Sequence, residues 1–323
     1  ERPRGRDRSL LRPVWNKGLK HEREQMKIRL SIVIANYNYG RFLADALESV
    51  VKQCAEPVLV EGRPALPIKG RPQDAVELII CDAASKDESV AVIRRYEKYL
   101  SWWCSEPDGG QSAAFNKGFA HARGEWLTWL NADEMYAKGM LLAWANLVAR
   151  KPKAEWITAN DMHFDDATKK IISLTWGPHR SIPFLTRNHC SYVAFGSSAF
   201  WRRSLYDKIG PIDEKINYGM DTEYWQRLTM AGYKPVRFNY FCWLFREHDE
   251  SKTFGKQTEK TLARKAQEAS YECRKNGYTF EHAIKNPWYD LWMLWRLLDG
   301  SLLVRFYRRR TLVGRSVVPF IPE

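Results

Sequence analysis

The stretch IRLSIVIANYNYGRFLADALESVVKQ, residues 28–53, predicts the unit from which the fold is built. Its first part holds an apolar run, Leu30–Ala35, that ends in Asn and Gly, as a buried strand does before a turn. Apolar residues then recur at helical spacing, at Phe42, Leu43, Ala46, Leu47 and Val50. We therefore expect a strand, a turn and a helix in that order.

The same order returns further along the chain. A second apolar run, Val76–Cys81, ends on Asp82 and precedes the helical pattern SVAVIRRYEKYL. Short strands are expected at WWCSE and at Trp126–Leu130. Residues 54–75 are rich in proline and glycine, so we expect a loop or an insertion there. Strands that alternate with helices predict βαβ units and a largely parallel sheet, which is an α/β fold.

Polar residues stand where three of these strands end, at Asn36-Tyr37-Asn38, at Asp82 and at Asn131–Glu134. In open parallel sheets, ligands bind outside the carboxyl ends of the strands. The sequence therefore predicts a site at one edge of the sheet.

Composition divides the chain into three parts. A basic tail or linker, residues 1–27, precedes the α/β domain, residues 28–255, and a helical, aromatic and basic extension follows at 256–323. Near the end of the domain, a well-bounded helix is expected to begin at Asp221 and to stop at Gly232.

The 323 residues carry a net charge of +13, much of it near the two ends. An acidic partner would suit this charge, but no nucleic-acid-binding motif appears, so nucleic acid is not an expected partner. The six cysteines form no CxxC pair, which argues against a zinc site and for reduced thiols in the cytoplasm. The longest uncharged stretch, Asn188–Trp201, is too short to span a bilayer, and the Arg-rich start lacks the apolar core of a signal peptide.

Five segments, in order, resemble family 2 glycosyltransferases with the GT-A fold. They are SIVIANYNYGRFLADALESV, ELIICDAASKDESV, EPDGGQSAAFNKGFAHARGEWLTWLNADE, SSAFWRRSLYDKIGPIDEKINYGMDTEYWQRLTMAG and REHDESKT. The resemblance implies a Rossmann-like, mostly parallel central sheet flanked by helices. It also implies a nucleotide-sugar donor, a divalent metal and inversion at the anomeric carbon.

The resemblance also assigns a nucleotide site. By match to the family motifs, its residues are Ala35, Asn36, Tyr37, Asp82, Asp108, Gly110, Gln111, Asn116, Lys117, Asn131 and Ala132. The chain departs from the family at Ala83, where the motif around the base-contacting acid has glycine. Alanine leaves the backbone less free at that turn.

The metal motif of the family, D-x-D, corresponds to Asn131-Ala132-Asp133. Because Asn131 supplies an oxygen but no charge, Asp133 is the expected ligand for Mn²⁺ or Mg²⁺, with Glu134 as a second candidate. His248 resembles a late histidine of the family that approaches the metal or the diphosphate. A purely structural histidine is the alternative.

The resemblance puts the catalytic base in GMDTEYW, at Asp221, with Glu223 as the competing candidate. A carboxylate there can take the proton of the acceptor hydroxyl. Asp221 also suits the N-cap of the helix that follows, and both roles can hold together.

The stretch NPWYDLWMLWRLLDGSLLVRFYRRRTLVGR, residues 286–315, carries tryptophans near one helical face and then a cluster of arginines. This pattern suits a membrane interface, and packing on the domain or on a partner subunit is the alternative. The expected location is the cytoplasm, either free or on the cytoplasmic face of the membrane.

Together these features predict an inverting, metal-dependent glycosyltransferase of the hexosyltransferase type. It would move a sugar from a nucleotide-sugar, by preference a UDP-sugar, to a hydroxyl of a glycan or lipid-linked acceptor in surface polysaccharide synthesis. A catalytically idle nucleotide-binding scaffold is the alternative, which Asn131 and the turn at Ala83 support.

Overall fold

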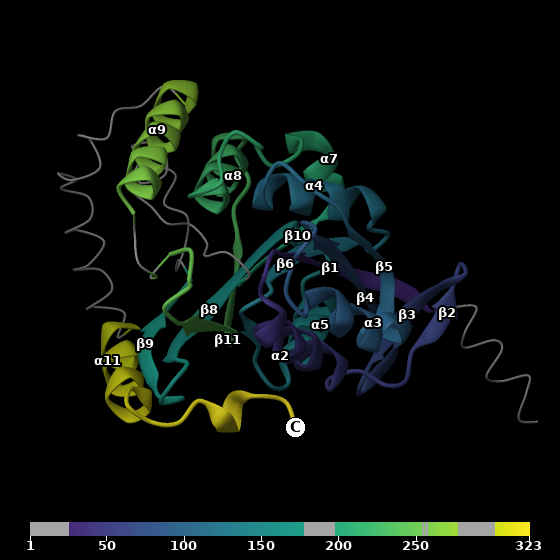
Figure 1. The fold of residues 1–323 in the computed structure, drawn as a ribbon. Helices are drawn as coiled ribbons and strands as arrows, with labels where there is room; N and C mark the ends of the chain where they lie inside the picture. The colour runs from purple at the N-terminus through teal and green to yellow at the C-terminus, as the bar shows by residue number, and fades with distance from the viewer. Residues whose placement is uncertain (1–25, 178–197, 254, 256–257, 277–300) are drawn as a thin grey trace, which may run out of the picture.

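The computed structural model describes residues 26–177, 198–253, 255, 258–276 and 301–323 (Figure 1). Eleven strands form one sheet in this part of the chain: β1 (Lys27–Asn36), β2 (Val58–Val60), β3 (Arg63–Ile68), β4 (Arg71–Asp82), β5 (Leu100–Ser105), β6 (Trp126–Asn131), β7 (Met135–Tyr136), β8 (Trp156–Asp165), β9 (Ile171–Thr175), β10 (Ala199–Arg202) and β11 (Val236–Glu247).

The centre of the sheet is a parallel set of strands in the order β5-β4-β1-β6. β1 lies inside this set, and residues 30–34 are completely buried. A strand that is covered on both faces needs mostly apolar residues, and the one polar residue of this run, Ser31, donates a hydrogen bond to Glu77 at 2.6 Å. The parallel βαβ order predicted from the first 131 residues is confirmed.

The other half of the sheet is mixed. β10 lies between β6 and β8 and runs antiparallel to both, whereas β11 runs parallel to β8. β7 and β9 pair antiparallel with β11 and β8. The α/β class is therefore confirmed, with antiparallel strands added outside the parallel centre.

Residues 54–75 form paired strands, so of the two alternatives the loop is wrong, and an insertion stays a prediction. β2 and β3 form a hairpin, and β3 pairs antiparallel with β4. Glu61 and Gly62 join β2 to β3 with φ values of 50° and 75°, which is the left-handed backbone that two-residue hairpin turns require. Gly62 and Gly70 lie in the turns before and after β3, whereas Pro64 and Pro67 lie within β3 and Pro72 within β4.

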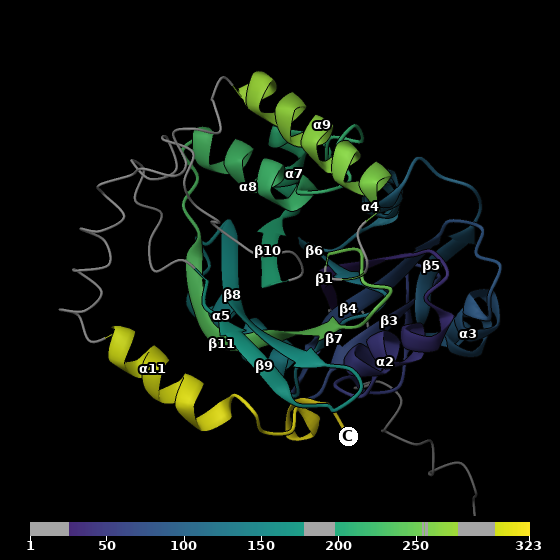
Figure 2. The ribbon, with the colours of Figure 1, turned by 60° about the vertical axis from the view of Figure 1, so that its left-hand side comes forward.

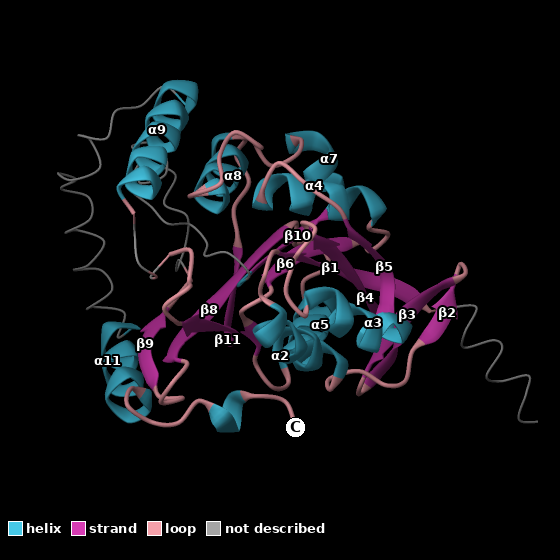
Figure 3. Ribbon diagram, in the orientation of Figure 1, coloured by secondary structure: helices cyan, strands magenta, loops and turns pink. Residues whose placement is uncertain are grey.

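Helices cover both faces of the sheet (Figure 3). One face carries α2 (Gly40–Val51), α3 (Ser89–Tyr96) and α5 (Met140–Arg150); the other carries α4 (Gln111–His121), α7 (Arg203–Ile209) and α8 (Met220–Met230). Each set shares a buried apolar cluster with the strands beneath it. Two single turns of 3₁₀-helix, η1 (Glu97–Tyr99) and η4 (Val318–Phe320), complete these connections.

Two helices follow the last strand. α9 (Glu259–Asn276) lies beside α8, and α11 (Ser301–Leu312) lies against β9 (Figures 1 and 2). The described parts of the extension are thus helical, whereas the Trp-rich residues 286–300 lie outside the described residues, as does most of the basic tail. In the described part of the chain, every helix is too short or too polar to cross a bilayer.

Candidate functional site

A cavity of about 1030 Å³ opens at the edge of the sheet where the parallel strands end. Five segments build much of its wall: Ala35–Tyr37, Gly109–Gln111, Asn131–Glu134, Tyr218–Asp221 and Glu250–Thr253. They come from the ends of β1 and β6, the starts of α4 and α8, and the loop after β11. The cavity is large enough for a ligand and lies where open α/β sheets bind one.

The ends of β1 and β4 are tied together behind the cavity wall. Asn36 donates from Nδ2 to Oδ1 of Asp82 at 2.6 Å, and Ser105 donates from Oγ to Oδ2 at 2.6 Å. Asp82 is buried and lies outside the cavity wall, whereas Asn36 and Tyr37 line it. In this arrangement the carboxylate of Asp82 orients Asn36 and does not face the cavity.

The sequence suggested that Ala83 is the residue under backbone strain in the turn after β4. The strained residue is the next one, Ala84. Ala84, and not Ala83, has a φ of 54°, in the left-handed region that favours glycine. Asn38 and Ser85 hold this turn, because the Asn38 amide donates to Oγ of Ser85 and the Lys86 amide donates to Oδ1 of Asn38, both at 2.8 Å. Two hydrogen bonds thus fix a conformation that alanine adopts at a cost.

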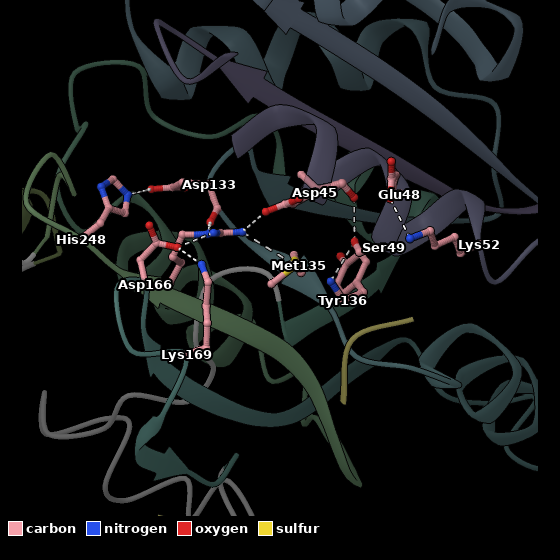
Figure 4. A network of polar contacts seen from close by, with 12 residues as sticks. Asp45, Glu48, Ser49, Lys52, Asp133, Met135, Tyr136, Asp166, Lys169 and His248 are labelled. Atoms are coloured by element: carbon pink, nitrogen blue, oxygen red, sulfur yellow. Dashed lines mark hydrogen bonds and ion pairs between the residues drawn. The ribbon is translucent and has the colours of Figure 1, made fainter. Parts of the chain in front are cut away.

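Asp133 lines the cavity, and His248 contacts it from just outside the wall, although the two residues are 115 positions apart (Figure 4). Nε2 of His248 lies 3.1 Å from Oδ2 of Asp133. The imidazole packs against the ring of Phe42, at 4.4 Å between centroids, and meets Tyr39 edge-on at 5.7 Å. The structure therefore brings together the two residues that the family resemblance assigned to the metal.

This pair suits a metal that takes few protein ligands. Among the described residues, no group of three or more His, Cys, Asp or Glu side chains is placed to hold a metal. Mg²⁺ and similar hard cations bind one or two carboxylates and complete their shell with water and substrate phosphates. Nδ1 of His248 is buried and has no hydrogen-bond partner among the described residues, so the ring has a nitrogen to spare for a ligand. Asp133 and His248 fit this kind of site, with Glu134 in the same wall.

Arg246 supports Asp133 from outside the cavity wall, and its partners Asp133, Asp166 and Asp45 are labelled in Figure 4. Its Nε donates to the backbone oxygen of Asp133 at 2.9 Å, and its two terminal nitrogens donate to Asp166 and Asp45 at 2.6 Å each. The guanidinium also lies over the ring of Phe42, 4.7 Å from its centroid. A buried arginine with all these partners fixes the backbone that presents Asp133.

Asn131 belongs to a chain of side chains that the sequence did not predict. Gln111 donates from Nε2 to Oδ1 of Asn131 at 2.8 Å, and Lys252 donates from Nζ to Oε1 of Gln111 at 2.7 Å. Lys252 also bonds the carbonyl of Asn217 and lies 4.8 Å from the ring centroid of Tyr218. Burial lowers the pKa of Lys252 to about 8. A positive charge therefore stands near the position where the family motif has an acid and this chain has Asn131.

Asp221 lines the cavity from the first turn of α8, but it is not the N-cap that the sequence predicts. α8 begins at Met220, and the cap position is Gly219, which has a φ of 79°. Oδ1 of Asp221 accepts the amide of Thr222 at 2.8 Å. Because Gly219 occupies the cap position, Asp221 is the second residue of α8, and its carboxylate lines the cavity.

Glu223, the competing base candidate, lies outside the cavity wall. Its side chain is completely buried and accepts from Nε of Arg227 at 2.9 Å and from Nζ of Lys275 at 2.8 Å. These ion pairs join α8 to α9. The contacts of Glu223 are structural, and of the two base candidates only Asp221 lines the cavity.

Asp108 and Gly110 shape the start of α4. The Gly110 amide donates to Oδ1 of Asp108 at 2.8 Å, and desolvation raises the pKa of the Asp108 carboxyl. Gly110 has a φ of 114°, and a Cβ there would stand 2.5 Å from Oδ1 of Asn217. Both residues line the cavity, and glycine is needed where the backbone approaches Asn217 so closely.

Asn116 and Lys117, also assigned to the nucleotide by resemblance, lie outside the cavity wall. Nδ2 of Asn116 donates to the carbonyl of Ile212 at 2.8 Å, which fixes the loop after α7 on α4. Lys117 pairs with Glu106 at 2.9 Å. Their contacts within the chain are those of structural residues around the site.

α9 completes the site from the far end of the chain. Oε2 of Glu268, a buried carboxylate, accepts the backbone amides of Asn217 and Tyr218 at 2.8 and 2.6 Å. Arg264 pairs with Glu268 at 2.8 Å and lines the cavity. The loop that leads into Asp221 is thus held by a helix that sequence reasoning assigned to a separate extension.

Curated relatives are similar to this chain over part of its length. It is 27% identical over 200 residues to an uncharacterised glycosyltransferase of Nostoc sp., which covers 58% of this chain and 54% of that protein. It is 30% identical over 163 residues to an uncharacterised glycosyltransferase of Mycobacterium tuberculosis, which covers 48% of this chain and 58% of that protein. The chain thus spans little more than half the length of these relatives.

Solved structures are similar at lower identity. The mannosyltransferase PcManGT from Pyrobaculum calidifontis, in complex with GDP-Man and Mn²⁺, gives a TM-score of 0.48 at 15% identity, over 88% of this chain and 83% of that chain. TarS 1-349 of S. aureus, in complex with UDP-GlcNAc, gives a TM-score of 0.47 at 14% identity, over 75% and 66%.

Residues 31–210, more than half of the chain, match the sequence profile of the family described as Glycosyl transferase family 2. The resemblance carried by the ordered motifs is confirmed. The helix-flanked α/β sheet described above is the GT-A arrangement that the resemblance implied. The chain belongs to glycosyl transferase family 2.

Proposed function

We propose that this protein is an inverting, metal-dependent glycosyltransferase that transfers a sugar from a nucleotide-sugar to a hydroxyl group. One observation carries the proposal: Asp133, paired with His248, and Asp221 border the same cavity at the carboxyl ends of the parallel strands. The first pair suits the diphosphate side of a donor. Asp221 suits the side from which an acceptor hydroxyl approaches.

The donor end of the cavity is formed by β1 and α4. Ala35–Tyr37 and Asp108–Gly110 would hold the nucleotide, since they line the wall beside Asp133. Asp133 and His248 would hold Mn²⁺ or Mg²⁺, and such a cation neutralises the charge that develops on a leaving diphosphate. Lys252, through Gln111 and Asn131, adds a positive charge close to the same place. A UDP-sugar is the donor that we propose.

In the transfer step, Asp221 takes the proton of the acceptor hydroxyl. The acceptor oxygen then forms a bond to the anomeric carbon as the bond from that carbon to the diphosphate oxygen breaks. Attack opposite the leaving group inverts the anomeric configuration. The position of Asp221 in the first turn of a helix makes this carboxylate well placed and rigid.

The acceptor that we propose is a glycan or a lipid-linked sugar of surface polysaccharide synthesis, and the transferred group a hexose. The support is the volume of the cavity, about 1030 Å³, and the basic charge of the chain, which suits an acceptor with a phosphate. We place the protein in the cytoplasm or on the cytoplasmic face of a membrane.

The test is sugar transfer from a panel of nucleotide-sugars with Mn²⁺, using Asp133→Ala and Asp221→Asn. Asp221→Asn should lower kcat by roughly 10²–10⁴-fold with an unchanged affinity for the nucleotide. With Asp133→Ala, added Mn²⁺ should no longer raise the rate of transfer. Asp207→Asn, an exposed acid on α7 outside the cavity wall, is the control and should behave as wild type. Equal transfer by wild type and both site variants would refute the assignment.

A catalytically idle nucleotide-binding scaffold is the second candidate, and Asn131, which carries no charge in the metal motif, is the observation that favours it. Calorimetry separates the two functions. Nucleotide binding without hydrolysis or transfer from any donor in the panel would favour the scaffold.

A further inference from the structure

Exposed apolar side chains gather at the C-terminal end of the described chain. Of the eleven large apolar residues that are most exposed among the described residues, six lie between Leu303 and Val318. Four stand on α11, and we name them the α11 patch: Leu303, Val304, Phe306 and Tyr307, with exposed fractions of 66%, 54%, 66% and 69%. Scattered apolar residues need no explanation, but a contiguous patch marks an interaction site.

α11 faces its own domain largely with arginines, and Leu312 at its end packs against the buried cluster of β8, β9 and β11. The guanidinium groups of Arg305 and Arg309 lie 5.2 and 5.8 Å from the ring centroid of Trp176, and that of Arg308 lies 5.7 Å from the ring of Phe241. Arginine stacks well on aromatic faces, so these contacts anchor the helix. A surface helix normally turns its apolar stripe to the core. Here the stripe points outward, and this orientation calls for a partner outside the described domain.

The charges around the α11 patch indicate the chemistry of that partner. Arg310 is exposed on the same helix, and Arg315 and Lys170 are exposed beside its end, where Lys170 pairs with Ser316. The whole chain adds a net charge of +13. Aromatic and aliphatic side chains rimmed by arginine and lysine are what an anionic lipid surface binds.

We propose that α11 docks on a membrane rich in anionic lipids, with Leu303, Phe306 and Tyr307 entering the interface and the basic rim on the headgroups. This surface lies within the stretch 286–315 that suggested a membrane in the sequence, but it rests on the described contacts of α11 and on none of the residues 286–300. It is also close to the cavity, because Trp176 follows Thr175, which lines the cavity wall. If the proposed transfer is correct, docking brings a lipid-linked acceptor to the cavity; the docking itself does not depend on that function.

The experiment is flotation of the full chain with vesicles of phosphatidylcholine, alone or mixed with phosphatidylglycerol. We expect binding to the mixed vesicles, which weakens as salt rises. Phe306→Glu with Tyr307→Glu should lower the bound fraction by about tenfold or more, because two apolar side chains leave the interface and two like charges enter it. Arg310→Gln should weaken binding only to the anionic vesicles.

Met230→Glu with Leu262→Glu is the matched control, since these side chains are 63% and 54% exposed on α8 and α9. It should bind vesicles as wild type does. The proposal is overturned if the wild type fails to float, if the patch variant floats equally well, or if the control loses as much binding. It is also overturned if light scattering finds a dimer that the patch variant dissolves while neither form binds vesicles, since a second copy then covers the patch. Transfer to a water-soluble acceptor, measured on the same variants, tests the proposed function separately.

Discussion

Asp133 depends on Arg246, a residue that does not itself face the cavity. The guanidinium holds the backbone oxygen of Asp133 and is itself held by Asp45 and Asp166. The side chain of Asp133 remains available to His248 and to a cation. If Asp133 holds the metal as proposed, loss of a partner that orients it typically costs roughly 10–100-fold in metal affinity.

Arg246→Lys is therefore expected to lower the affinity for Mn²⁺ by roughly 10–100-fold, because lysine cannot hold three partners in a fixed plane. The measurement is titration of Mn²⁺ in the presence of a nucleotide, followed by electron paramagnetic resonance. Arg150→Lys, at an exposed position on α5, is the control and should leave the affinity unchanged. Unchanged Mn²⁺ affinity in Arg246→Lys would show that the loop of Asp133 does not need this support.

Lys252 makes the site sensitive to alkaline pH. Its pKa is lowered by burial from 10.5 to about 8, so the folded protein loses this proton before the unfolded chain does. In the folded protein, Lys252 is protonated and positively charged well below this pKa, and it is neutral well above it. Between the two values the unfolded state binds more protons, so this group makes stability rise with pH there.

We expect kcat/KM for the donor to fall as the pH rises through about 8, the pKa of Lys252. Lys252→Met should lower kcat/KM at neutral pH and flatten the alkaline limb, whereas Lys252→Arg, which stays charged, should retain activity at higher pH. The comparison is made by pH profiles of all three proteins with saturating Mn²⁺. An alkaline limb that Lys252→Met retains would assign it to another group.

At the scale of elements, α9 fixes the loop before α8 by hydrogen bonds to its backbone. The buried Glu268 accepts two consecutive backbone amides of that loop, and charged acceptors form stronger hydrogen bonds than neutral ones. Asp221 follows the two residues that carry these amides by only a few positions. Its placement therefore depends on a helix that begins after the family motifs have ended.

Glu268→Gln is expected to lower kcat by about tenfold through a looser Asp221, with little change in nucleotide affinity. Glu259→Gln, at the exposed start of α9, is the matched control and should be neutral. The readouts are steady-state transfer and nucleotide titration on each protein. If Glu268→Gln lost nucleotide affinity and kept kcat, the hydrogen bonds of Glu268 would serve the donor end of the cavity.

The sequence predicted elements well where hydrophobic periodicity is strong, as in β1, α2 and β4. It failed at residues 54–75, because glycine and proline mark loops and hairpin turns alike, and only pairing partners distinguish the two. It also misplaced the cap of α8, because Asp221 is a good capping residue and Gly219 gives no side-chain signal. Local patterns therefore predicted the class of each element better than its ends.

At the scale of the whole molecule, the family profile ends at residue 210, but the site does not. Lys252 and Arg264 line the cavity from beyond that point, and His248 contacts Asp133 in its wall. Motif resemblance predicted His248 and Asp221. Lys252 was missed because Gln111, its partner at the start of α4, is 141 positions away, and no spacing rule predicts such a contact. Arg264 was missed because its i,i+4 pair with Glu268 marks only a helix and does not show that α9 borders the cavity. The site is therefore assembled from both halves of the chain, and each half alone holds only part of it.

The central position of β10 has a consequence for how the chain is made. One edge of β6, a Trp-rich strand, stays without its partner until β10 has been synthesised about 70 residues later, which takes roughly 4 to 14 seconds at ordinary translation rates. Open strand edges of this kind are templates for aggregation. The nascent chain therefore passes through an interval in which a chaperone that covers apolar edges would raise its yield, and that interval closes when residues 199–202 enter the sheet.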